Sequence, residues 1–143
     1  MTDELDREIL RALQIDGRMT HRELGKVVGL SANATGARVQ RLIERGVIVG
    51  FQAVVDHAKL GRSMEATVDV WLNDDRQRSP LMELVADDDR VVECFHLTGP
   101  LDFRLRARVA SADDLNALLN RLRDEGGVRQ TDSRLVLEHI PTQ

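Results

Sequence analysis

The chain has 143 residues, of which 42% are hydrophobic and 31% are charged, a composition typical of globular proteins. Its formal net charge is −4, and a single cysteine, Cys94, excludes an intramolecular disulfide. The sequence shows neither a signal peptide nor an apolar run as long as a membrane span. We therefore expect a cytoplasmic protein of one or two small domains.

The charge is distributed unevenly along the chain. Residues 17–45 contain six basic and two acidic residues, a net charge of +4, whereas residues 51–143 contain twelve basic and seventeen acidic residues, a net charge of −5. A basic segment beside an acidic remainder is typical of a modular DNA-binding protein, although solvated helix faces give the same pattern.

The N-terminal part of the chain predicts three helices. Residues 3–16 place apolar side chains on one helical face, and Thr20 and Glu23 then form a capping box that begins a second helix. Gly29 suits the end of that helix, and Ser31 is a suitable N-cap for a third, which ends at Gly46. Because the third helix is rich in arginine and amide side chains, the second and third helices together predict a helix-turn-helix that reads the DNA major groove.

The predicted third helix carries the side chains that can read DNA. Arginine forms paired hydrogen bonds to guanine, and asparagine or glutamine to adenine. We predict base-edge contacts from Asn33, Thr35, Arg38 and Gln40, and mainly phosphate contacts from Arg22, Lys26, Arg41 and Arg45. A symmetric dimer would present two such helices, so the operator should be palindromic, with half-sites about 34 Å apart or a multiple of that.

The segment after the third helix predicts a change of structure. Residues 47–55 are apolar and β-branched, which favours a strand, and residues 56–62 are a polar hinge that contains a glycine. We therefore divide the chain into a helix-turn-helix domain (1–50), a strand and hinge linker (51–62) and a second domain (63–143).

The second domain predicts the order strand, helix, strand, strand, helix, strand. The strands are expected at 63–73, 91–97, 101–109 and 128–140, with helices that begin at Ser79-Pro80 and after Ser111. This is the ferredoxin-like βαββαβ arrangement, whose helices cover one face of the sheet. The open face would pair two acids with three arginines across strands (Glu65, Asp69, Arg104, Arg106, Arg108), and this face favours dimerisation over a merely solvated surface.

Other chemistry has little support in the sequence. The four histidines are scattered without metal-ligand spacing. Cys94 and His96 share a strand face, but a buried thiol beside a packed histidine is a simpler interpretation than a nucleophile pair. Residues 87–89 are three consecutive aspartates, which are typical of a solvated turn. We expect no enzyme activity, no metal and no cofactor.

Three stretches together resemble the Lrp/AsnC (leucine-responsive, feast/famine) transcription regulators: LDREILRALQIDGRMTHRELGKVVGLS, RVQRLIERGVIVGFQAVVD and ECFHLTGPLDFRLRARV. The resemblance covers almost the whole chain. It implies an α+β protein with an N-terminal winged-type helix-turn-helix domain followed by a ferredoxin-like ligand-sensing (RAM) domain. It also implies homodimers, often assembled into octamers, and a response to an amino acid. By position, Ser31 would cap the recognition helix, and Arg38 and Arg41 would face DNA.

The same resemblance implies an effector site. The turn formed by Thr98, Gly99, Pro100, Leu101 and Asp102 matches the family's effector motif, and the loop formed by Thr131, Asp132 and Ser133 lies where the family often adds polar contacts. Asp102 would accept the ammonium group of an amino acid and backbone N–H groups near Gly99 would bind its carboxylate, unless these residues merely shape a hairpin turn.

The chain departs from the family at two places. The start of the recognition helix has Ala32, Ala34 and Ala37 where the family often has prolines and a further arginine, and Gly36 lowers helix propensity by roughly 1 kcal/mol relative to alanine. Pro100-Leu101 stands where an acidic or aromatic residue is frequent in the effector turn.

The sequence therefore predicts a DNA-binding transcription regulator that responds to an amino acid. An effector-independent, nucleoid-type architectural protein is the alternative. A small ferredoxin-like enzyme with an appended helical domain is disfavoured, because the sequence offers no convergent catalytic set.

Overall fold

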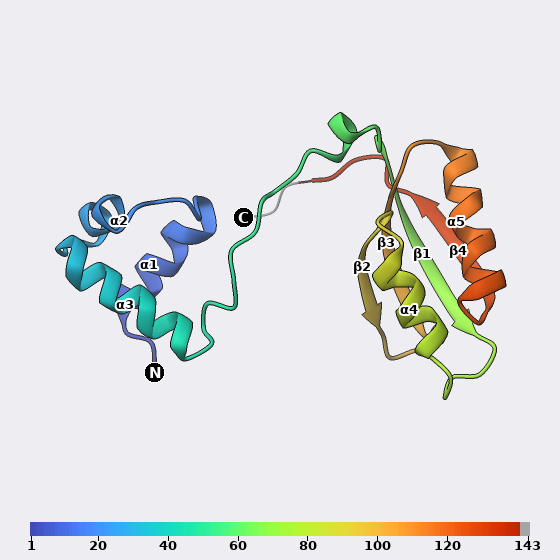
Figure 1. Cartoon of the computed structure of the whole chain (residues 1–143), viewed down its shortest axis with the longest axis horizontal. Coiled ribbons are helices and arrows are strands. Elements are labelled where there is room, and N and C mark those ends of the chain that lie inside the picture. The colour runs from blue at the N-terminus through green and yellow to red at the C-terminus, as the bar shows by residue number, and fades with distance from the viewer. Residues whose placement is uncertain (141–143) are drawn as a thin grey trace. The chain divides into compact units, whose positions relative to one another are not determined.

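The computed structural model describes residues 1–140, and the chain divides into two compact units, residues 1–54 and the residues that follow. Each unit has a buried apolar core of its own. Figure 1 shows the helices of the first unit and the sheet with its helices in the second. Within residues 1–140, none of the helices is both long enough and apolar enough to cross a membrane.

The first unit consists of three helices, α1 (Glu4–Ile15), α2 (His21–Val28) and α3 (Ala32–Glu44). The predicted caps are confirmed. The Thr20 hydroxyl accepts from the Glu23 backbone N–H, the Glu23 carboxylate accepts from the Thr20 N–H, and the Ser31 hydroxyl accepts from the Ala34 N–H. The core of this unit is formed by Ile9, Leu24, Val28, Val39 and Leu42, which are all buried.

The predicted strand at 47–55 is wrong. The backbone N–H groups of Val47 and Ile48 donate to the Leu42 carbonyl, but residues 49–55 are irregular and form no backbone hydrogen bonds in the described part of the chain. Val49 and Val54 are 95% and 98% exposed. A strand is stable only when a neighbouring strand satisfies its backbone groups, and a single copy of the chain offers none here. In a single copy, residues 49–55 therefore do not form the predicted strand.

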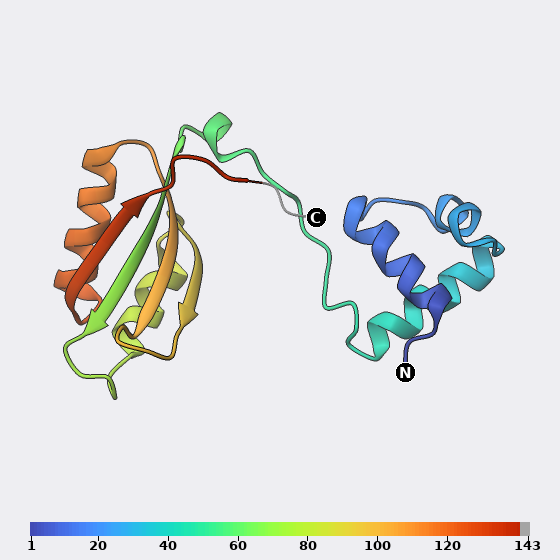
Figure 2. The ribbon, with the colours of Figure 1, turned by 180° about the vertical axis from the view of Figure 1, so that it is seen from behind.

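The second unit is the predicted ferredoxin-like fold. Its strands are β1 (Met64–Leu72), β2 (Val91–His96), β3 (Phe103–Val109) and β4 (Val128–Leu135), and its longer helices are α4 (Ser79–Asp87) and α5 (Ala112–Glu125). A short 3₁₀ helix, η1 (His57–Leu60), precedes β1. The sheet has the order β2-β3-β1-β4, and each neighbouring pair is antiparallel. Both α4 and α5 lie on one face (Figure 1), and the view from behind shows the other face uncovered (Figure 2).

Several boundaries differ from the predictions. The third strand begins at Phe103 instead of residue 101, and the first two strands are one or two residues shorter than expected. The last strand ends at Leu135 instead of residue 140, which also places the predicted loop 131–133 inside β4. The helix α4 includes Ser79 and is preceded by Arg78, so Ser79 is not its N-cap and no side chain caps it.

The predicted charge pairs on the open sheet face are confirmed. Arg104 Nε lies 2.6 Å from Asp69 Oδ1, and Arg108 Nη2 lies 2.7 Å from Glu65 Oε2. Arg106 and Arg134 add longer contacts to these two carboxylates. Glu65 and Asp69 are only 8% and 5% exposed because the arginines lie over them. The hydrogen bonds from Arg104 lower the pKa of Asp69.

The expectation of a solvated turn at residues 87–89 is wrong for Asp88. This residue is 5% exposed, and its carboxylate accepts hydrogen bonds from Arg90 Nε (2.8 Å), Arg90 Nη2 (2.7 Å) and Arg121 Nη1 (3.0 Å). The Arg90 guanidinium lowers the pKa of Asp88 to about 2. Asp87 and Asp89 are exposed, as expected of a turn. Asp88 therefore joins the turn before β2, through Arg90, and α5, through Arg121, to the end of α4.

Candidate nucleic-acid interface and effector turn

The outer face of α3 carries exposed polar side chains. Asn33, Ala37 and Gln40 follow one another at positions i, i+4 and i+7, and all three are exposed, opposite the buried Val39 and Leu42. Gln40 Nε2 donates to Glu44 Oε1 at 3.1 Å. Arg41 is exposed on the flank of this stripe. We call Asn33, Ala37, Gln40 and Arg41 the outer stripe.

Thr35 cannot contact a base edge, so this prediction is wrong. Its side chain is fully buried, and its hydroxyl donates to the Ser31 carbonyl at 2.8 Å. Residue 35 lies one turn before Val39 on the face that packs against the core, so Thr35 is a core residue. Ser31 acts as the predicted N-cap of α3.

Arg38 is directed towards α1, away from the outer stripe. Its Nη1 lies 2.6 Å from Asp3 Oδ2 and 2.8 Å from Asp6 Oδ1. Asp3 is also the N-cap of α1, and the Asp6 backbone N–H together with the Arg38 guanidinium lowers the pKa of Asp3. In the unbound protein two carboxylates hold the Arg38 guanidinium, so the base contact by Arg38 stays a prediction and requires the guanidinium to leave both of them. Its role in the structure is to join α3 to the start of α1.

The predicted phosphate-binding side chains remain accessible. Arg22 and Lys26 lie four residues apart on one face of α2. Arg41 lies four residues before Arg45, the C-cap of α3, and all four side chains are exposed. Arg45 Nη1 also donates to the Met1 carbonyl at 3.2 Å. The first unit therefore presents cationic side chains on both helices of the helix-turn-helix.

Two glycines at the contact between α2 and α3 were not recognised as structural in the sequence. A Cβ at residue 25 would lie 2.5 Å from the Leu30 carbonyl oxygen, so only glycine fits this crossing. A Cβ at residue 36 would lie 2.7 Å from His21 Nδ1. A glycine inside a predicted helix was the available signal, since it weakens the helix unless close packing requires it.

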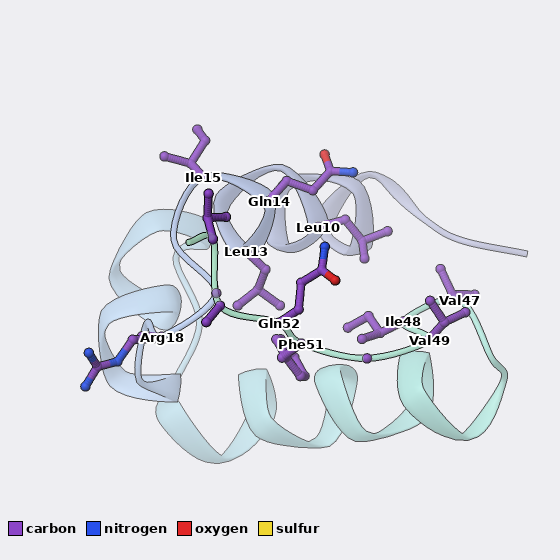
Figure 3. Close-up of a pocket in the computed structure, with 14 residues that line it drawn as sticks. Leu10, Leu13, Gln14, Ile15, Arg18, Val47, Ile48, Val49, Phe51 and Gln52 are labelled. Carbon is purple, nitrogen blue, oxygen red and sulfur yellow. The ribbon is translucent and has the colours of Figure 1, made fainter. Parts of the chain in front are cut away.

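Residues 47–54, the end of the first unit, run past α1 and border an open apolar groove. Figure 3 shows Leu10 and Leu13 of α1 on the side that faces the segment carrying Ile48 and Phe51. The groove has a volume of about 650 Å³, and its other lining residues are mostly apolar. Phe51 remains 57% exposed, so the groove leaves apolar linker surface uncovered.

The predicted effector turn is a hydrogen-bonded connection between β2 and β3. Asp102 Oδ2 accepts from the Leu72 backbone N–H at 2.8 Å, and Trp71 Nε1 donates to the Pro100 carbonyl at 2.7 Å. Gly99 has φ = +110°, and a Cβ there would meet no atom within 4 Å. Thr98, Gly99 and Pro100 are exposed, whereas Leu101 and Asp102 are half-buried. One carboxylate oxygen of Asp102, the predicted acceptor of the ammonium group, is therefore already hydrogen-bonded within the protein.

The structure does not bring residues 131–133 together with this turn. Thr131 and Ser133 pair in register with the buried Val70 and Val68, whereas Asp132 pairs with Asp69 on the open face. Strand β1 separates β4 from the start of β3, a distance of about 10 Å for two strand spacings. Asp132 Oδ2 is also bonded to Arg134 Nη2 at 2.6 Å.

The remaining candidate residues are Cys94, which is half-buried, and His96, which is exposed. Burial raises the pKa of the Cys94 thiol, which opposes nucleophilic reactivity. His96 stacks on Phe103 with ring centroids 4.7 Å apart. Within residues 1–140, no group of three or more histidine, cysteine or acidic side chains has a metal-binding arrangement.

A helix-turn-helix with an exposed polar recognition helix, followed by a ferredoxin-like domain, defines the class of DNA-binding regulators with an attached sensor domain. Comparison with known families agrees. The AsnC-type helix-turn-helix domain matches residues 3–43, and the Lrp/AsnC ligand binding domain matches residues 65–142. The chain belongs to the Lrp/AsnC family of DNA-binding transcription regulators, and the predicted family and fold class are confirmed.

Individual relatives span nearly the whole chain. The HTH-type transcriptional regulator LrpA of Mycobacterium tuberculosis is 35% identical over 97% of both chains. FL11 of Pyrococcus horikoshii is 32% identical over 95% of this chain and 89% of the relative. Among solved structures, a transcriptional regulator of Neisseria meningitidis in complex with L-Met has a TM-score of 0.92 and 27% identity, with 99% of this chain and 94% of that chain covered.

Proposed function

We propose that the protein is a sequence-specific transcription regulator that acts in the cytoplasm as an oligomer of dimers and responds to an amino acid. The outer stripe of α3 is the observation that carries the proposal. Asn33 and Gln40 supply amides that pair with adenine edges, and Arg41 supplies a cation that bonds guanine or phosphate. These side chains are exposed on a rigid helix whose opposite face is fixed in the core.

An α-amino acid is the effector that we propose for the second domain. Asp102 would bind its ammonium group through Oδ1, since Oδ2 already accepts from Leu72. The open backbone at Gly99 would supply N–H donors to its carboxylate, because no side chain shields that residue. The L-Met complex of the Neisseria meningitidis relative supports this class of ligand.

Self-association is supported by apolar surface that a single copy leaves exposed. In the irregular segment 49–55, Val49 and Val54 are almost fully exposed, and the backbone around them is unpaired. Phe95 is 47% exposed, and the pairing of its strand with β3 places it opposite Arg104 on the open sheet face. We propose that a second copy covers this face, and that dimers assemble further, into octamers by the family resemblance.

A ligand screen combined with DNA binding tests the proposal. Each amino acid is titrated by calorimetry into the wild type, Asp102→Asn and the matched control Asp132→Asn. Asp102→Asn keeps an oxygen for the Leu72 N–H while removing the charge. At least one amino acid should bind the wild type and the control but bind Asp102→Asn much more weakly.

DNA binding is then measured with and without that amino acid, on a duplex selected by the wild type from random sequences and on a random duplex. The proposal requires a preference for the selected duplex and a shift on adding the ligand. Equal affinity for both duplexes, with no response to any amino acid, would instead establish the effector-independent architectural protein.

A further inference from the structure

The recognition helix lacks a side chain at residue 36, and His21 of the preceding helix occupies that space. A Cβ built on Gly36 would lie 2.7 Å from Nδ1 and 3.1 Å from Cε1 of the His21 imidazole. Real Cβ atoms do not approach a ring atom this closely, so any other residue at position 36 must displace the imidazole. The imidazole thus takes the place of a side chain on α3.

This place borders the outer stripe. Residue 36 lies three positions after Asn33 and four before Gln40, which makes both of them its neighbours on the surface of α3. His21, Asn33 and Gln40 are all exposed. The imidazole therefore lies at the edge of the surface that carries the base-reading amides.

The position of His21 in α2 indicates what it meets on DNA. It is the first residue of α2, the helix that precedes the recognition helix. In a helix-turn-helix the recognition helix enters the major groove while the preceding helix crosses the sugar–phosphate backbone. The side chains beside Gly36 on this face of α3 are those of Asn33 and Gln40, and both are uncharged. The acidic side chain near His21 on α2 is Glu23, and its carboxylate already accepts from the Thr20 N–H at 2.7 Å.

We propose that His21 is a DNA-contacting residue whose imidazole N–H donates a hydrogen bond to a phosphate at the edge of the major groove. Gly36 leaves room for that ring. The contact fixes how deeply and at what angle α3 enters the groove, which is the usual role of phosphate contacts. It adds a residue of α2 to the DNA interface and explains why a helix-weakening glycine stands in the recognition helix.

Fluorescence anisotropy at pH 7.5 tests this proposal with the full chain. His21→Ala, His21→Gln, Gly36→Ala and the double variant His21→Ala/Gly36→Ala are titrated against a duplex selected by the wild type and against a random duplex. Thermal unfolding of each variant shows whether the first unit remains folded. Arg41→Ala is the reference for loss of a different DNA contact.

A hydrogen bond to a charged phosphate is stronger than one between neutral groups, so its loss should weaken binding by about tenfold or more, and His21→Ala should lose this much on both duplexes. His21→Gln should recover most of it because the amide also donates. Gly36→Ala should weaken binding because its methyl group displaces the ring.

The double variant separates this proposal from a purely structural role. It relieves the clash and restores helix propensity, yet it should bind as weakly as His21→Ala. If the double variant binds like the wild type, or if His21→Ala binds both duplexes within twofold of the wild type, the proposal is overturned. A loss confined to the selected duplex would overturn the assignment to phosphate. Since Arg41→Ala is measured in parallel, failure of DNA binding as a whole is a distinct result.

Discussion

The buried carboxylate of Asp88 should stabilise the second unit by an amount that depends on pH. Its pKa is about 2 in the folded chain, compared with 3.8 for an ordinary aspartate. A difference of this size corresponds to about 2 kcal/mol of unfolding free energy at neutral pH. Because the folded-state pKa is the lower one, this stabilisation is complete above pH 5 and is lost as the pH falls towards 2. About half should remain at pH 3.

The substitution Asp88→Asn isolates the contribution of this carboxylate to the unfolding free energy. The amide is nearly isosteric with the carboxylate but cannot attract Arg90 and Arg121, so the variant should unfold with about 2 kcal/mol less free energy at pH 7. In a unit of this size that is about 10 °C in Tm. Asp87→Asn is the matched control, because Asp87 is a neighbouring aspartate that also contacts Arg121 but is 72% exposed in its side chain.

Urea unfolding followed by tryptophan fluorescence measures the effect. Trp71 is the only tryptophan in the chain and lies in β1, so its emission reports the second unit. The difference between wild type and Asp88→Asn should shrink by about half between pH 7 and pH 3, since protonated Asp88 resembles asparagine. A difference that stays constant with pH, or one no larger than that of Asp87→Asn, would refute the reasoning.

The remaining predictions concern the first unit. Arg38→Met should lower the Tm of this unit but leave the salt dependence of DNA binding unchanged, whereas Arg41→Met should reduce the slope of log K against log salt by about 1 per lost phosphate contact; the opposite ranking would show that Arg38 does reach DNA. Gly25→Ala should destabilise the unit by about 1–3 kcal/mol despite its better helix propensity, because its Cβ would meet the Leu30 carbonyl. Circular dichroism should show this loss while Trp71 fluorescence is unchanged, and a stabilised variant would contradict the packing argument.

Most of the fold was predictable because local patterns and tertiary packing agree. The capping residues Thr20 and Ser31 and the alternating apolar residues of β3 (Phe103–Val109) each determine structure through contacts close in sequence. The strand predicted at residues 47–55 is wrong because a β-branched pattern needs a partner strand, which sequence preference alone cannot supply. The β-branched residues do have strand propensity, but a single copy of the chain holds no partner strand for them.

The site was less predictable because ion pairs form between distant parts of the sequence. Arg38 was assigned to DNA from its residue type, but Asp3 and Asp6, more than thirty residues away, hold it. Thr35 looked polar and surface-exposed, yet its hydroxyl is satisfied by the Ser31 carbonyl one turn earlier, which allows burial. The sequence predicts a surface position for Asp88 because one of the two arginines that bond it, Arg121, comes from α5, more than thirty residues away.

The cross-strand charges on the open sheet face also determine which alignment of β1 and β3 can form. In the observed register Glu65 faces Arg108 and Asp69 faces Arg104. A slip of two residues would keep every apolar side chain on the helix side, so hydrophobicity alone would tolerate it. In one direction, however, Asp69 would face Asp102, and in the other Glu65 would face Ala110 and lose its arginine. These charges therefore select a single sheet among alternatives that the apolar core cannot tell apart.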